Sequence, residues 1–201
     1  MQAARGTSLS DDATPDPAPA PDPARRRRLW LRFATVALVV YAVDVGAKIL
    51  AVAELTDRED IPLVGDLLVL HLTRNPGAAF STGTQFTEVL SCIAIAAVFV
   101  VLWVSRRLGS AGWATGLGLL LAGIAGNLTD RLLREPGPLR GHVIDFLMLP
   151  HWPVFNVADM AINAGAIVIL VLAFRGIHLD GTREPRTGET DADDASQEPT
   201  T

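Results

Sequence analysis

This sequence contains a single cysteine and few charged residues, and both features limit the classes of protein to which it can belong. Cys92 is the one cysteine among 201 residues, which excludes a disulfide within the chain, a CxxC metal site and a zinc cluster. The four histidines lack the spacing of metal ligands. Only 19% of the residues are charged while 49% are hydrophobic, a balance too apolar for an ordinary soluble domain. The sequence therefore indicates a membrane protein, and we expect it to hold no metal or other cofactor.

The acidic charge lies mainly in the two ends of the chain. Residues 1–24 carry one arginine and four aspartates, and residues 178–201 carry two arginines and seven acids. The first end is also rich in proline and alanine, so it cannot bury enough apolar surface to fold. We expect a disordered cytoplasmic tail at 1–28, a membrane domain at 29–176, and a disordered acidic cytoplasmic tail at 177–201.

Four apolar segments have the composition of membrane-spanning helices, which need about 20 residues. We expect spans at 33–55, 89–105, 108–129 and 160–174, the last lengthened toward Asn156. A cleaved signal peptide is the alternative for the first segment, but its apolar core would be shorter and free of charge. The expected fold class is an all-α polytopic membrane protein with four transmembrane helices.

Between the first two spans the sequence is amphipathic. Residues 67–73 form a short apolar run, and the turn signal Asn75-Pro76-Gly77 follows it. Two short strands, or a strand and a turn, fit this region better than another span. The small residues after Asn75 suit a groove for a peptide, although a tight turn explains them as well.

Basic residues set the expected orientation. With four spans, one side of the membrane receives Arg25–Arg28, Arg32, Arg106, Arg107 and Arg175. The positive-inside rule places this side, with both termini, in the cytoplasm. The bias is incomplete, because the other side receives Arg58, Arg74, Arg131, Arg134 and Arg140. The acids and amides at the span ends then gather at the external face.

Asp44 and Lys48 lie four residues apart within the first span, so they share a helical face and can neutralise each other. One interpretation is an interior ion pair near the outer membrane surface. The other is a scaffold pair that fixes this helix against an active site.

Two Asn-x-x-Asp pairs, Asn127 with Asp130 and Asn156 with Asp159, flank the segment that carries Asp145. Acids at the membrane are costly and are functional candidates by default. Two close carboxylates retain one proton between them, so one can activate water while the other polarises a scissile carbonyl. This pattern predicts an aspartic peptidase.

Three aspartates compete for the two catalytic places. Asp130 adjoins Arg131, which would keep it ionised, so we expect it to be structural. Asp145 has apolar neighbours that would raise its pKa. Asp159 opens the fourth span, where the helix dipole favours a carboxylate, but a simple cap leaves the amides on the same face unexplained. We expect Asp145 and Asp159 to be catalytic.

These motifs resemble those of bacterial lipoprotein signal peptidase (signal peptidase II) in the same order over residues 30–175. The matching motifs are Asp44-x-x-x-Lys48, Asn75-Pro76-Gly77-Ala78-Ala79-Phe80, Gly126-Asn127-x-x-Asp130-Arg131, Val143-Ile144-Asp145-Phe146 and Phe155-Asn156-x-Ala158-Asp159. The resemblance implies a small external β-cradle beside the four spans and a catalytic pair at Asp145 and Asp159. It also implies that the substrate is a prolipoprotein cleaved before a diacylglyceryl-modified cysteine. Supporting roles would fall to Asn75, Asn127, Asp130, Arg131, Asn156, Asp44 and Lys48.

Two other classes fit the sequence less well. A proton-coupled transporter should show inverted repeats and acids near mid-span, and a scaffold needs no converging acids and amides. We expect a monomeric, multi-pass enzyme of the inner (cytoplasmic) cell membrane with its active site toward the external face. Its partners would be lipidated prolipoproteins and membrane lipid, with no nucleic acid and no metal.

Overall fold

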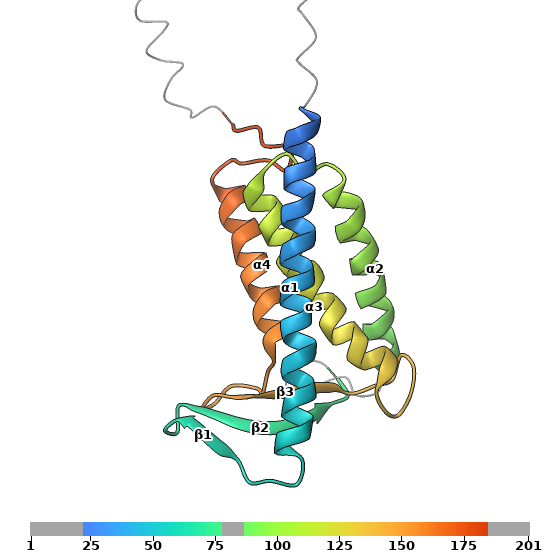
Figure 1. Cartoon of the computed structure of the whole chain (residues 1–201), viewed down its shortest axis with the longest axis vertical. Helices are drawn as coiled ribbons and strands as arrows, with labels where there is room; N and C mark the ends of the chain where they lie inside the picture. Colours follow the sequence, from blue (N-terminus) through green and yellow to red (C-terminus); the bar gives the residue numbers. More distant parts are fainter. Residues whose placement is uncertain (1–21, 78–86, 185–201) are drawn as a thin grey trace, which may run out of the picture.

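The computed structural model describes residues 22–77 and 87–184 of the chain (Figure 1). The two ends at 1–21 and 185–201, which hold most of the expected tails, lie outside the described residues. So do Ala78, Ala79 and Phe80 of the Asn-Pro-Gly motif.

Four helices are long and apolar enough to cross a membrane, as predicted. They are α1 (Pro23–Leu55), α2 (Thr87–Ser105), α3 (Ala111–Leu133) and α4 (Val157–Phe174). α1 begins earlier than expected, because Asp22 caps it through the Ala24 amide at 2.9 Å and Pro23 suits a first helical turn. Residues 23–28 are therefore helical, and their assignment to a disordered tail was wrong.

α3 is the central helix and packs against α1, α2 and α4. Its glycines permit this closeness, since a Cβ on Gly123 would collide with the Ala158 carbonyl of α4. A Cβ on Gly126 would collide with the Asp44 carboxylate of α1. α3 also extends past the expected span end at residue 129, so Asp130 lies in its last turns and not beyond the helix.

A small antiparallel sheet lies at the end of the bundle opposite to the start of α1 (Figure 1). Its order is β1 (Ile61–Val64), β2 (Leu68–Asn75) and β3 (Val143–Met148). The first two strands confirm the prediction of short strands after the first span. The third was not foreseen, so the all-α class is inexact: four helices carry a three-stranded sheet drawn from both connections at this end.

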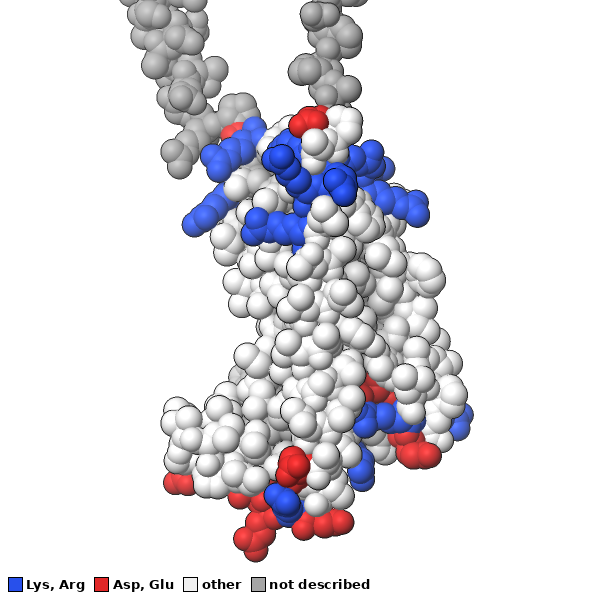
Figure 2. All heavy atoms as spheres, in the orientation of Figure 1, with Lys and Arg blue, Asp and Glu red and all other residues white. Residues whose placement is uncertain are grey.

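The charges divide between the two ends of the molecule (Figure 2). On the face shown, arginines form a band across the end where α1 begins, called the arginine belt below, and most visible acids lie at the opposite end, where the sheet is. The surface between them is almost free of charge, as expected of a bundle that lies in a bilayer.

The first residues after α4 fold back onto the arginine end of the bundle. Ile177 and Arg183 form a β-bridge. The Trp113 indole donates to the Ile177 carbonyl at 2.8 Å, and the Gly109 amide donates to the Leu179 carbonyl at 2.9 Å. The assignment of this stretch to a disordered tail beginning at 177 was therefore wrong as far as residue 184.

Candidate active site

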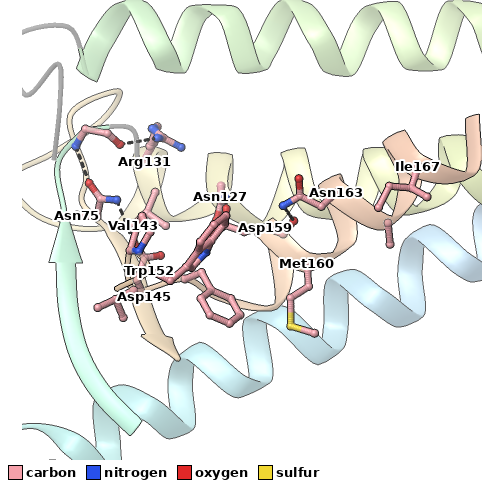
Figure 3. Close-up of a pocket in the computed structure, with 15 residues that line it drawn as sticks. Asn75, Asn127, Arg131, Val143, Asp145, Trp152, Asp159, Met160, Asn163 and Ile167 are labelled. Atoms are coloured by element: carbon pink, nitrogen blue, oxygen red, sulfur yellow. Dashed lines mark hydrogen bonds between the residues drawn. The ribbon is translucent and has the colours of Figure 1, made fainter. Parts of the chain in front are cut away.

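A cavity of about 580 Å³ lies where the sheet meets the adjoining ends of α3 and α4. Its polar side chains are Asn75, Asn127, Arg131, Asp145, Asp159 and Asn163. Its apolar wall includes Trp152, Phe155, Met160 and Ile167. Figure 3 shows Asp145 on the sheet side of this cavity, while Asp159, Asn163 and Ile167 follow one another along α4. The structure thus brings both predicted catalytic acids to one cavity.

Strand alternation directs Asp145 into the cavity. Ile144 and Phe146, its neighbours on β3, are buried in a cluster with Ala51 and Leu55 of α1. Because successive strand residues face opposite sides, Asp145 faces away from that cluster and is 2% exposed.

Two side-chain amides hold the Asp145 carboxylate. The Asn75 Nδ2 donates to one carboxylate oxygen at 3.0 Å, and the Asn156 Nδ2 donates to the other at 2.6 Å. Burial raises the pKa of Asp145 to about 6, while the hydrogen bond from Asn75 opposes the shift and the charge of Asp159 adds to it. Asp145 is thus a carboxyl group that holds a proton more tightly than an exposed aspartate.

Asp159 lies in the first turn of α4 and forms a capping box with Asn156. The Asp159 amide donates to the Asn156 side chain at 3.0 Å, and the Asn156 amide donates to the Asp159 carboxylate at 3.1 Å. The remaining Asp159 oxygen accepts from the Asn127 Nδ2 at 2.8 Å. Asp159 caps the helix, as expected from its position, and it lines the cavity at the same time. The two functions are therefore compatible.

Asn156 connects the two acids, because it caps the helix of Asp159 and donates to Asp145. Its side chain is fully buried, and its Nδ2 also lies 3.2 Å from the Asn127 Oδ1 and 3.3 Å from the Ile144 carbonyl. One amide residue therefore contacts both carboxylates and, together with Asn75 and Asn127, fixes their relative positions.

The predicted Asp44–Lys48 ion pair is present, and its partners extend beyond a simple pair. The Lys48 Nζ lies 2.9 Å from Asp44 and 3.0 Å from Asp130, and it donates to the Asn127 Oδ1 at 2.9 Å. Asp44 also accepts the Ala158 amide at 2.8 Å. The pair joins α1 to α3 and to the start of α4, directly behind the two cavity acids.

Asp130 is buried and does not line the cavity. It was expected to pair with Arg131, and that expectation was wrong: its cations are Lys48 and Arg134, one helical turn further along α3. It also accepts the Ile144 amide at 3.2 Å, which fastens β3 to α3. Arg131 instead lines the cavity and donates to the Gly77 carbonyl at 3.2 Å.

The sequence reasoning missed most of the apolar wall of the cavity. Met160, Ala164 and Ile167 lie four and three residues apart, so they share one face of α4, and their start directly after Asp159 was a usable signal. Phe155 gave no such signal, because its place depends on backbone pairing with Leu147 across a tight turn. Within residues 22–77 and 87–184, no group of three or more His, Cys, Asp or Glu side chains is arranged to hold a metal ion.

The chain is similar to known proteins over most of its length. A family model described as signal peptidase (SPase) II matches residues 36–175. A lipoprotein signal peptidase of Mycobacterium avium is 46% identical over 172 residues, covering 86% of this chain and 93% of the relative. One of Mycolicibacterium smegmatis is 47% identical over 178 residues, covering 89% and 74%.

Solved structures show a similar fold. A bacterial membrane enzyme structure superposes with a TM-score of 0.62 at 20% identity, covering 84% of this chain and 94% of the other. A second gives a TM-score of 0.59 at 22% identity, covering 71% and 92%. The likeness supports four membrane-spanning helices with a small sheet at one end.

Proposed function

Since the chain belongs to the signal peptidase II family, which removes signal peptides from prolipoproteins, we propose that it is an aspartic endopeptidase whose catalytic pair is Asp145 and Asp159. The observation that carries the proposal is that both carboxylates line one cavity while amides, and no cations, hold them. An acid pair that makes no ion pair with a described residue can share one proton, as the chemistry requires.

The two acids take different roles in this mechanism. Asp145, with its raised pKa, carries the shared proton and donates it toward the scissile carbonyl oxygen. Asp159 takes a proton from water, and the water oxygen attacks the carbonyl carbon. The tetrahedral intermediate collapses as the peptide C–N bond breaks. The leaving amine takes the proton that Asp159 holds, and Asp145 takes back a proton from a hydroxyl of the intermediate as the C=O bond re-forms. No metal or covalent intermediate takes part.

The substrate class follows from the family and from the cavity wall. We propose a prolipoprotein whose cysteine carries diacylglycerol and which is cut just before that cysteine. The apolar residues Met160, Ala164 and Ile167 run from Asp159 along α4 toward the middle of the bundle, where they would contact signal-peptide side chains or lipid. Supporting roles fall to Asn75, Asn127, Asp130, Arg131, Asn156, Asp44 and Lys48.

The membrane placement proposed here puts the arginine end in the cytoplasm and the cavity toward the external face of the cell membrane. Cysteine labelling tests it in a Cys92→Ala background. An impermeant thiol reagent should label Pro138→Cys in intact cells and should label Arg183→Cys only after the membrane is opened. Labelling of Arg183→Cys in intact cells would reverse the orientation. We propose that the enzyme acts as a monomer, with both tails cytoplasmic.

Cleavage of a purified, diacylglyceryl-modified prolipoprotein, read as a gel shift, tests the activity. Asp145→Asn and Asp159→Asn should each abolish cleavage while the protein still inserts and binds substrate. The double variant should be no worse than either single one, because the two act as a unit. The same prolipoprotein without its lipid should not be cleaved.

The Asp130→Asn variant tests whether Asp130 supports the catalytic pair or belongs to it. Because Asp130 holds β3 through the Ile144 amide, this variant should lose thermal stability along with activity. Turnover by well-folded Asp145→Asn, together with none by equally well-folded Asp130→Asn, would make Asp130 the partner of Asp159.

A further inference from the structure

A second cavity lies far from the candidate active site, between α1 and α2. Both helices pack along α3 but make little contact with each other. The groove between them has a volume of about 360 Å³ and an almost wholly apolar lining. Its lining includes Trp30, Phe33 and Tyr41 of α1, Leu102 of α2, and Leu121 and Ala125 of α3.

A smaller cavity of about 170 Å³ lies at the arginine end of the same two helices. Its lining includes Arg25, Arg26, Arg106 and Arg107 against Asp22 and Asp180. Asp22 accepts the Ala24 amide, and Asp180 accepts from Thr182, so both acids have partners of their own. With four arginines against two aspartates, the lining of this cavity is positive overall.

The two cavities are neighbours along the same helices. On α1, Arg26 of the basic cavity and Trp30 of the groove lie four residues apart and so share a face. Leu102 of the groove lies in the last turn of α2, and Arg106 of the basic cavity directly follows the end of that helix. An apolar groove thus lies next to a basic cavity.

The arginines at this junction are available to a ligand. The Arg106 side chain makes no hydrogen bond or ion pair with the part of the chain that the structure describes. Arg107 only stacks over the Trp103 ring, 5.2 Å from its centre. Arg25 and Arg26 donate to the carbonyls of Gly109 and Arg106 and keep their positive charge.

We propose that this composite site binds one anionic glycerophospholipid, with an acyl chain in the groove and the phosphate among the arginines. Basic pockets between helices on the cytoplasmic side suit anionic head groups. A signal-peptide helix fits less well, because its positively charged first region would face the arginines. A second copy of this chain would bring a second arginine belt against the first.

The test uses the full-length protein in nanodiscs containing equal amounts of phosphatidylglycerol and phosphatidylcholine. Native mass spectrometry of the released protein then reports which lipid stays bound. We expect one phosphatidylglycerol to stay bound per protein. Nanodiscs of phosphatidylcholine alone should give no comparable bound lipid, and inorganic phosphate added to them should not bind in its place.

Two independent changes should remove the bound lipid. Arg106→Gln with Arg107→Gln should weaken retention roughly 30-fold, since each arginine near an anionic head group contributes about fivefold. Ala34→Trp, at an exposed position that lines the groove, should fill the acyl-chain site.

Matched controls share the chemistry of these changes but lie outside both cavities. Arg175→Gln with Arg183→Gln removes the same charge at the same end, and Thr35→Trp adds the same ring to the next exposed residue of α1. Both controls should retain the lipid.

Three results would overturn the proposal. If phosphatidylcholine is retained as well as phosphatidylglycerol, the site does not recognise the head group. If the control arginine pair loses as much lipid as Arg106→Gln with Arg107→Gln, the arginine belt attracts anionic lipid in general and holds no specific site. Displacement of the lipid by a synthetic signal peptide would assign the groove to substrate.

Discussion

Replacing Asp145 by asparagine should change how the stability of this protein depends on pH. The side chain is 2% exposed, and burial raises the pKa of its carboxyl group to about 6 from 3.8. The folded protein therefore holds the Asp145 proton over a pH range in which the unfolded chain has lost it. Asparagine is neutral throughout and removes this difference.

The sign and size follow from linkage. Below pH 3.8 both states are protonated, and the full stability is present. Between pH 3.8 and about 6 the unfolded chain loses this proton while the folded protein keeps it. The free energy of unfolding therefore falls by about 1.36 kcal/mol per pH unit, about 3 kcal/mol in all, and levels off above that range. Asparagine avoids that loss but turns an NH2 group toward the Asn75 or Asn156 amide, which costs about 1–3 kcal/mol at every pH.

The variant should therefore be less stable than the natural protein at pH 4 and as stable or more stable at pH 8. A change of about 3 kcal/mol corresponds to roughly 6–12 °C in the midpoint of thermal unfolding for a chain of this size. The assay is thermal unfolding in lipid nanodiscs at half-unit steps from pH 4 to pH 8.

A matched control is Asp66→Asn, which changes an exposed aspartate in the turn between β1 and β2. It should follow the natural protein at every pH. If the midpoint difference between Asp145→Asn and the natural protein is the same at pH 4 and pH 8, the buried carboxyl group does not titrate as argued.

Three further predictions concern the support of the site and its chemistry. Lys48→Met should lower the free energy of unfolding by about 3–5 kcal/mol, because it leaves the buried Asp44 without its cation. Adding Asp44→Asn should reduce that loss. If the double variant instead loses the sum of the two single losses, the two residues are not coupled. Gly126→Ala should lower the unfolding midpoint because its Cβ would meet Asp44, whereas Gly46→Ala, with nothing within 4 Å, should not. Cleavage should show a bell-shaped pH profile that reports the acid pair, and it should persist in chelator; inhibition by a chelator with recovery on metal addition would contradict a metal-free mechanism.

Much of the fold was readable because its signals are local. Each span is a run of apolar residues whose length alone separates it from a soluble helix. The start of α4 was also readable, because Asn156 and Asp159 have the spacing of a capping pair. The Asp44–Lys48 pair needed only the spacing of one helical turn.

The features that sequence reasoning missed depend on distant partners. β3 has buried residues on both faces, so its apolar run carries no alternation and its strand form depends on pairing with β2. Asp130 has a basic neighbour in sequence, but helical geometry turns it toward Arg134 and the distant Lys48. The segment 177–184 is held by contacts with Gly109, between α2 and α3, and with Trp113 of α3, which composition does not encode.

The four buried or cavity-lining aspartates of the site differ in whether they form ion pairs. Asp44 and Asp130 share Lys48, and Asp130 also has Arg134, so both acids behind the cavity have cationic partners. Asp145 and Asp159 form no ion pair with the described residues and receive hydrogen bonds from neutral amides instead. A cation in contact with either cavity acid would favour two ionised carboxylates and leave no proton to donate. Asn127 keeps Lys48 one residue away, because it accepts from Lys48 and donates to Asp159. The network thus secures the helices with charge and holds the cavity acids with amides, which is the environment a shared proton requires.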